Sequence, residues 1–232
     1  MQITIREPGS AITHFIAMMM AVFAAVPLLV KAGVQSGQEN FLAMAIFMGS
    51  MILLYGASAT YHSVDLTGKS LRVFRKLDHM MIFVMIAGSY TPVCLIVLHN
   101  KIGYILCALV WATAILGIVF KAFWVTCPKW VSSVIYIGMG WVCILAMPQL
   151  LAGLSFGAFM WLLAGGLFYT VGGVIYAMKF PVFHNRFRYF GCHELFHVFV
   201  MAGSLCHFIV MYVYSVSYTH LRAHETLRPL VC

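Results

Sequence analysis

Long apolar runs separated by short polar segments dominate this chain of 232 residues. Most runs have about 17–25 residues, the length that an α-helix needs to cross the hydrocarbon core of a bilayer. None shows the alternation of apolar and polar residues that marks the strands of a membrane barrel. The pattern therefore predicts an all-α integral membrane protein, a bundle of seven transmembrane helices, at residues 11–31, 40–62, 78–98, 102–123, 131–148, 158–178 and 193–216.

The polar segments between these runs are short, so neighbouring helices are expected to pack antiparallel in one domain, residues 1–216. Hydrophobicity and periodicity are lost abruptly after that point, in residues 217–232. This last segment resembles translated cloning or adapter sequence. We interpret it as a non-native tail and exclude it from functional reasoning.

The composition supports a membrane protein, because 63% of the residues are hydrophobic and only 9% are charged. Soluble domains have about 25% charged residues. The formal charge of +8 is explained by loops that face anionic lipid, so nucleic acid is not expected as a partner and membrane lipids are. The seven cysteines include no CxxC pair, which argues against a disulfide framework and a cysteine-based zinc site.

The distribution of Lys and Arg predicts the orientation of the chain. With a cytoplasmic N-terminus, the outer segments hold only four basic residues, Lys31, Lys101, Arg222 and Arg228. The inner segments then hold the other ten, Arg6, Lys69, Arg72, Arg75, Lys76, Lys121, Lys129, Lys179, Arg186 and Arg188. Cytoplasmic loops of membrane proteins carry the excess of positive charge. We therefore expect a multi-pass protein of the plasma (inner) membrane with its N-terminus inside and its C-terminus outside.

Candidate chemistry is concentrated in the seventh run, which begins with His193 and His197. Residues four apart lie on one face of a helix, and two imidazoles so placed form half of a tetrahedral zinc site. A third histidine, His62, ends the second run. In the predicted topology the end of run two and the starts of runs three and seven meet at the cytoplasmic edge of the bilayer. His62, His193 and His197 are therefore predicted to bind one Zn²⁺.

Three imidazoles leave the fourth position of the metal open for water, which is the arrangement of catalytic zinc. Asp78, at the start of run three, is predicted to be the general base, with Ser58 beside it. The alternative for Asp78 is an ion pair with Arg75 or Lys76.

Other histidines fit this site less well. His207 lies about 15 Å of helix rise beyond His197, too far for the same metal, and is expected to hydrogen-bond across the bundle. His79 points away from Asp78 and is interpreted as structural. His14, His99 and His184 have no evident partner.

Two other functions are compatible with the same residues. The stretch His193–His197 matches HExxH, in which Glu194 would be the general base of an intramembrane metalloprotease. Alternatively, the zinc only holds helices together in a non-enzymatic sensor, cytolytic or channel-like protein.

Small residues and one proline predict local features of the helices. Gly165 and Gly172, and likewise Gly166 and Gly173, are seven residues apart and suit close helix packing. Pro92 is expected to kink the third helix.

Several segments, taken in order, resemble the hemolysin III branch of the progestin and adipoQ receptor superfamily. They are residues 58–62, 77–79, 87–92, 139–141, 165–172 and 193–208. The resemblance implies a seven-helix fold with a cytoplasmic N-terminus, and zinc held at the positions of His62, His193 and His197, with Asp78 and Ser58 beside it. In that family the residue after the first histidine of the last helix varies, which weighs against Glu194 as the base.

The resemblance also suggests an activity. Receptor relatives are linked to ceramide hydrolysis, and bacterial relatives to membrane-fluidity homeostasis. We therefore expect a zinc-dependent hydrolase of lipid amide or ester bonds that affects membrane lipid composition.

Overall fold

The structure is a computed structural model that describes residues 5–35, 37–178 and 190–215. Within these ranges all regular elements are helices, and seven helical spans are long and apolar enough to cross a membrane. The predicted seven-helix membrane bundle is confirmed. The predicted non-native tail, residues 217–232, lies outside the described residues. So do five of the basic residues in the charge count, Lys179, Arg186, Arg188, Arg222 and Arg228.

Four of the spans are single α-helices: α1 (Pro8–Gln35), α2 (Gly37–Ser63), α4 (Lys101–Phe123) and α7 (Phe156–Met178). Two others end in a π-helical segment: α3 (Gly68–Pro92) continues through Val93–Leu98, and α8 (Cys192–Ile209) continues through Val210–Ser215. The fifth span has three parts: α5 (Lys129–Gly140), a 3₁₀ segment Trp141–Ala146, and α6 (Met147–Gly153).

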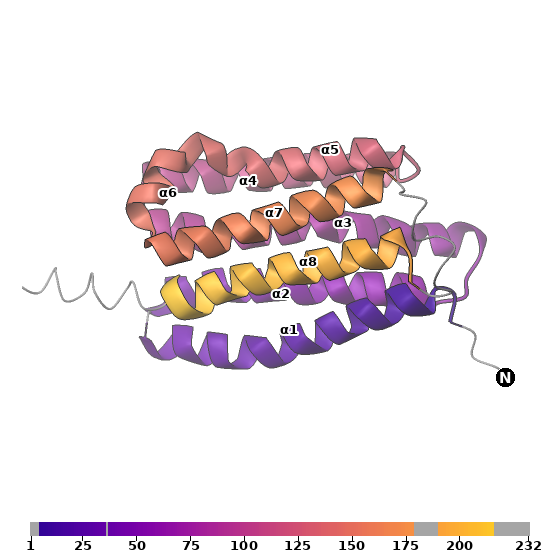
Figure 1. The fold of residues 1–232 in the computed structure, drawn as a ribbon, viewed down its shortest axis with the longest axis horizontal. Helices are drawn as coiled ribbons and strands as arrows, with labels where there is room; N and C mark the ends of the chain where they lie inside the picture. The colour runs from indigo at the N-terminus through magenta and orange to yellow at the C-terminus, as the bar shows by residue number, and fades with distance from the viewer. Residues whose placement is uncertain (1–4, 36, 179–189, 216–232) are drawn as a thin grey trace, which may run out of the picture.

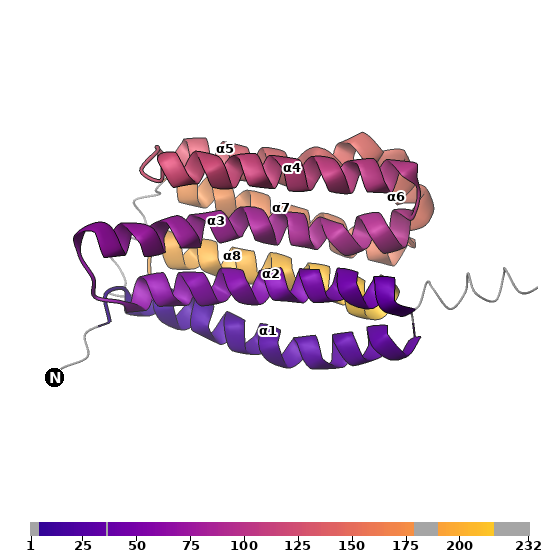
Figure 2. The same cartoon turned by 180° about the vertical axis from the view of Figure 1, so that it is seen from behind.

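The helices form a closed ring in chain order, as Figures 1 and 2 show from opposite sides. Each span packs on the next one along the chain, and α8 returns to α1. The third span is the most buried of the seven, with α2 and α4 on either side. This closure brings the N-terminal end of α8 beside the N-terminal end of α1 and the C-terminal end of α2.

The third helix begins ten residues earlier than the apolar pattern predicts, at Gly68 instead of residue 78. Hydropathy missed this part because four basic side chains lie in its first nine residues. Asp78 therefore lies about 15 Å of helix rise from the start of α3, well inside the helix.

The fifth span is interrupted where the sequence predicts a continuous helix over residues 131–148. The hydroxyl of Tyr90, on α3, donates to the carbonyl oxygen of Gly140 at 2.6 Å and accepts from the amide of Cys143 at 2.9 Å. Backbone groups freed by a broken membrane helix need such partners, since no water is available there. Tyr90 thus stabilises the 3₁₀ segment.

Small residues in α7 allow the close packing that the sequence predicts, and the helix type of the third span changes at Pro92, where a kink is expected. A Cβ atom on Gly165 would lie 2.3 Å from the His207 ring, and one on Gly172 would lie 2.9 Å from Phe199, so both glycines allow α7 to approach α8 closely. Gly166, by contrast, faces open space. After Pro92 the third span changes from α-helical to π-helical hydrogen bonding.

Candidate metal centre

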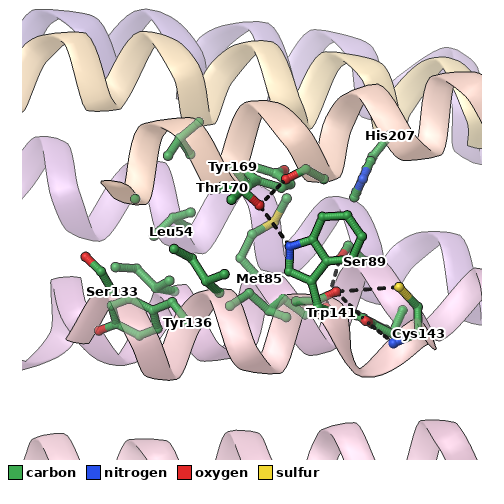
Figure 3. A pocket seen from close by; sticks show the side chains of 18 of the residues that line it. Leu54, Met85, Ser89, Ser133, Tyr136, Trp141, Cys143, Tyr169, Thr170 and His207 are labelled. Atoms are coloured by element: carbon green, nitrogen blue, oxygen red, sulfur yellow. Dashed lines mark hydrogen bonds between the residues drawn. The ribbon is translucent and has the colours of Figure 1, made fainter. Parts of the chain in front are cut away.

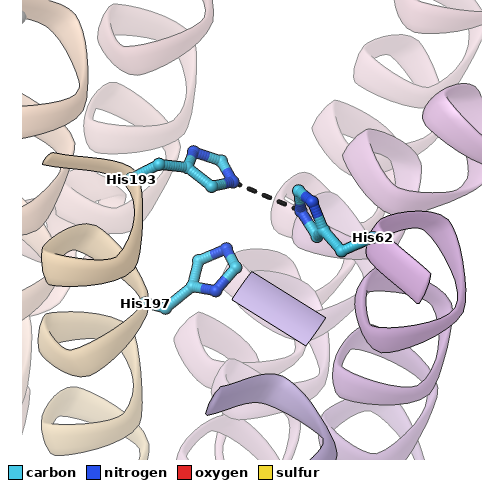
Figure 4. Close-up of side chains that lie close together, drawn as sticks. All are labelled: His62, His193 and His197. Carbon is cyan, nitrogen blue, oxygen red and sulfur yellow. Dashed lines mark hydrogen bonds between the residues drawn. The ribbon is translucent and has the colours of Figure 1, made fainter. Parts of the chain in front are cut away.

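Three histidine side chains converge between the last turn of α2 and the first two turns of α8 (Figure 4). One ring nitrogen from each of His62, His193 and His197 lies within 4.8 Å of the others. His62 is 2% exposed and His197 is 1% exposed, whereas His193 is partly buried. The structure therefore brings together the three residues predicted as ligands, in a group that could hold a metal ion.

The spacing of one pair of ring nitrogens fits a tetrahedral metal. The Nε2 atoms of His62 and His193 are 3.2 Å apart. Zn–N bonds of roughly 2.0–2.1 Å at tetrahedral angles separate two ligand nitrogens by about 3.3 Å. All three donors are imidazoles, and imidazole is a ligand that zinc and several other transition metals share.

Two of the histidines are oriented by side chains of the first helix and the residue before it. Nδ1 of His62 is hydrogen-bonded to the carboxylate of Glu7. Because a carboxylate can only accept, Nδ1 carries the proton and Nε2 keeps the lone pair that a metal needs. The same bond lowers the pKa of Glu7 to about 2, against the opposing effect of burial.

His197 has an equivalent partner in Thr13. Its Nδ1 lies 3.1 Å from the Thr13 hydroxyl oxygen, which is itself 3.0 Å from the carbonyl oxygens of Gly9 and Ser10. The hydroxyl proton is directed to one of these carbonyls, so the oxygen accepts from Nδ1–H of His197. Nε2 of His197 is then also free for a metal.

His14 is a further histidine beside this group, for which the sequence suggested no partner. Its ring stacks on His197 with centroids 3.5 Å apart and an interplanar angle of 11°. Both of its ring nitrogens are buried, and neither has a hydrogen-bond partner in the described part of the chain.

Sequence reasoning missed these contributions of Glu7, Thr13 and His14. No spacing rule connects them with the histidines of α2 and α8. One signal was present: the topology that gathers His62 and His193 at one edge places the start of the first helix there too.

Asp78 and Ser58 are both buried, and both line the same cavity as His193 and His197. The Asp78 carboxylate lies 3.5 Å from Nδ1 of its neighbour His79. No ion pair between Asp78 and Arg75 or Lys76 is found among the described residues, and the role of Asp78 stays a prediction. Nδ1 of His79 donates to the backbone carbonyl oxygen of Arg75, 2.9 Å away, in keeping with a structural role.

Glu194 is held by bonds that tie α8 to α1. One carboxylate oxygen accepts from the hydroxyl of Ser10, and the other accepts from the amide of Gly191 at 2.8 Å, which caps the start of α8. Both oxygens of this carboxylate therefore have protein donors.

An apolar cavity of about 180 Å³ lies within the bundle, lined by His193 and His197 together with the residues labelled in Figure 3. Its walls include Leu54 of α2, Met85 of α3, Tyr136 of α5, and Trp141 from the 3₁₀ segment of the fifth span. His207 lines it as well and faces the neighbouring helix through an edge-on ring contact with Tyr169, at 5.3 Å between centroids.

A second, more polar cavity of about 610 Å³ lies on the other side of the histidines. We call it the vestibule. Four residues line both spaces: Asp78, His79, Tyr176 and His193. The histidine group therefore stands at the junction between a polar space and an apolar one.

Comparison with known proteins agrees with this architecture. The family described as "Haemolysin-III related" matches residues 2–208. A protein named "Hemolysin-3 homolog" from Bacillus subtilis (strain 168) is 36% identical over 214 residues, which cover 92% of this chain and 96% of that protein. "Hemolysin-3" from Bacillus cereus is 35% identical over 208 residues, covering 90% and 91%. The "Adiponectin receptor protein" of Drosophila melanogaster is more distant, at 25% identity over 236 residues, covering 92% of this chain and 52% of the receptor.

Proposed function

Because the chain belongs to the hemolysin III family, we propose that it is a zinc-dependent hydrolase of lipid amide or ester bonds. It is a multi-pass membrane protein, and in bacteria the members of this family lie in the plasma membrane. The observation that carries the proposal is the position of the three histidines. They stand where a polar space meets an apolar one, with a buried carboxylate beside them. Such a junction suits an amphipathic substrate whose reactive carbonyl lies between its chain and its headgroup.

The histidine group supports zinc as the metal, because three protein ligands with an open fourth position are the pattern of catalytic zinc sites. When bound, Zn²⁺ would supply a Lewis acid that polarises a carbonyl and lowers the pKa of water. Glu7 and Thr13 would keep the ring nitrogens of His62 and His197 aimed at it.

The chain's own residues would do the rest. Asp78 lines both spaces, so its carboxylate is placed to take a proton from water at the junction and to pass it to the leaving group. Ser58 has a buried hydroxyl beside Asp78, and it would donate to that carboxylate or to the substrate. The apolar cavity would hold the chain and exclude water.

The bonds of Glu194 support this assignment over the metalloprotease. A zincin base needs a carboxylate that faces the metal and its water. Here the carboxylate caps α8 and binds Ser10.

Replacing Asp78 and Glu194, each in its own variant, by the corresponding amide tests the proposal. Replacing a general base lowers the rate by about 10²–10⁴-fold, so Asp78→Asn should abolish most lipid hydrolysis by the purified, zinc-loaded protein. Glu194→Gln should retain most of it. Glu39→Gln, in the first turn of α2 at the opposite end of that helix, is the control. Full activity of Asp78→Asn would show that Asp78 is not the base.

A second candidate function comes from the name of the Bacillus cereus relative, "Hemolysin-3". Under this reading the protein is cytolytic, and the metal only joins helices. Lysis of erythrocytes by the purified protein, unchanged in Asp78→Asn, together with no turnover of lipid, would favour it.

A further inference from the structure

The vestibule carries three basic side chains from three separate parts of the chain. Arg6 precedes α1, Arg75 lies one turn before Asp78 on α3, and Lys129 begins α5. Together they line the polar side of the junction at which the histidines stand.

Three acidic residues also line the vestibule, but two of them are engaged elsewhere. Glu7 is bonded to His62, and Glu194 is bonded to Ser10 and Gly191. The third, Asp78, contacts His79. Glu7 also forms an ion pair with Nε of Arg6 at 3.5 Å, whereas no ion pair of the described residues joins Arg75 to these carboxylates.

The two guanidinium groups have unused hydrogen-bonding capacity. Nε and Nη2 of Arg6 are buried and make no hydrogen bond to any described residue, although Nε lies 3.5 Å from the Glu7 carboxylate. Arg75 is partly buried, and it has no ion pair with an acidic residue of the described ranges. Buried donors without acceptors are costly, so an acceptor from a ligand would be favoured here.

Aromatic rings hold two of the three cations in place. The Arg6 guanidinium lies 4.2 Å from the centre of the Tyr61 ring, and the Lys129 ammonium lies 4.3 Å from that of Tyr176. Tyr176 also lines the apolar cavity, so Lys129 is positioned close to the junction itself. A cation held in this way has less freedom to lose when it binds an anion.

We propose that the vestibule binds a phosphate group, carried as the headgroup of the amphipathic substrate whose chain enters the apolar cavity. This inference rests on the proposed function and adds the class of substrate. A phosphomonoester carries about −1.5 to −2 charges and three acceptor oxygens, which matches cations that approach from three sides. Guanidinium forks pair with phosphate through two parallel hydrogen bonds. A neutral headgroup would leave the donors of Arg6 and Arg75 without acceptors.

Binding of two lipids that differ only in the phosphate tests the proposal. The detergent-purified full chain is titrated with phosphatidic acid and with diacylglycerol of the same acyl chains, and bound lipid is counted by native mass spectrometry. Loss of one charge-assisted hydrogen-bonded contact corresponds to about a tenfold change in affinity. We expect phosphatidic acid to bind about tenfold more tightly or better, and Arg75→Gln to remove that preference.

Arg72→Gln is the matched control, because Arg72 lies on the same helix, is exposed and does not line the vestibule. It should keep the preference. Arg6→Gln, on a different element, should lose it and so guards against a folding defect peculiar to Arg75→Gln. If Arg72→Gln and Arg75→Gln weakened the binding of phosphatidic acid equally, the effect would be one of general surface charge and the proposal would be overturned. Equal affinity of the unmodified protein for the two lipids would overturn it as well.

Two further measurements, competition by inorganic phosphate and an assay of hydrolysis, distinguish the source of the phosphate and the two proposals. Displacement of phosphatidic acid by millimolar inorganic phosphate would assign the site to a free phosphate group, whereas its retention would assign it to the lipid headgroup. Because binding is measured without turnover, a lipid preference without hydrolysis would overturn the hydrolase proposal alone. Hydrolysis without the preference would overturn the headgroup proposal alone.

Discussion

The carboxylate of Glu7 connects the exposed edge of the molecule with one of its most buried histidines. Half of this side chain is open to solvent, yet it is bonded to His62, which is 2% exposed. Metal-ligating histidines commonly use their second nitrogen in this way, and the partner fixes both the tautomer and the orientation of the ring.

Glu7→Gln is therefore predicted to weaken zinc binding without removing it. Loss of such an outer partner typically costs about 10–100-fold in metal affinity, because the ring is held less firmly and is a weaker base. The dissociation constant can be measured by competition with a chromophoric chelator. The bond to His62 lowers the pKa of Glu7 to about 2, so its carboxylate is charged at neutral pH, where the two proteins should be compared.

The control for this prediction is Glu39→Gln, which removes an exposed carboxylate at the other end of α2. Its zinc affinity should equal that of the unmodified protein. An unchanged affinity in Glu7→Gln would mean that His62 is held by its surroundings alone.

At the scale of single residues, the sequence predicted the three histidines whose positions depend on helical spacing and on the order of the spans. His193 and His197 follow from helical periodicity, and His62 from the antiparallel order of the spans. Glu7, Thr13 and His14 could not be predicted in the same way, because their roles depend on how the side chains of α1 pack against α2 and α8.

At the scale of the elements, the contact between α7 and α8 depends on the absence of side chains. Gly165 and Gly166 are neighbours in sequence but differ in surroundings. A Cβ on Gly165 would meet the His207 ring at 2.3 Å and the backbone oxygen of Gly203 at 3.2 Å, whereas a Cβ on Gly166 would meet nothing within 4 Å.

Gly165→Ala is predicted to destabilise the protein by about 1–3 kcal/mol, the usual cost of overpacking, while Gly166→Ala should be neutral or slightly stabilising. Thermal unfolding in detergent compares the two variants under identical conditions. Equal melting temperatures would show that α7 and α8 can separate slightly at no cost.

The boundaries of the elements were the least predictable feature of the fold. Hydropathy locates the part of a helix that lies in lipid, so the basic first turns of α3 were missed. It also cannot detect that a side chain from another helix, Tyr90, stabilises a break in the fifth span.

At the scale of the whole molecule, the histidine group joins segments that are far apart in the chain, since 131 residues separate His62 from His193. A metal there would act as a link between the second span and the last. The number of spans was predicted from apolar run lengths. The orientation of the chain in the membrane stays a prediction based on the basic residues of its loops.

Removal of zinc is predicted to lower the melting temperature. A ligand at a hundred times its dissociation constant stabilises by about 2.7 kcal/mol, which for a chain of this size corresponds to a shift of roughly 5–10 °C. About one zinc per chain should be found by elemental analysis, and none in His62→Ala or His197→Ala. A chelator should then lower the melting temperature of the unmodified protein but not of these variants. An equal effect of the chelator on all three would place the zinc elsewhere.

The return of the last helix to the first determines when the centre can exist during biosynthesis. Glu7 and His62 enter the membrane with the first two spans, but His193 and His197 arrive only with the seventh. Until then His62 lacks the other two histidines of the group, and the polar end of the bundle stays incomplete. A metal held by all three histidines could bind only after insertion of the final helix, so a chain interrupted during synthesis would lack the centre.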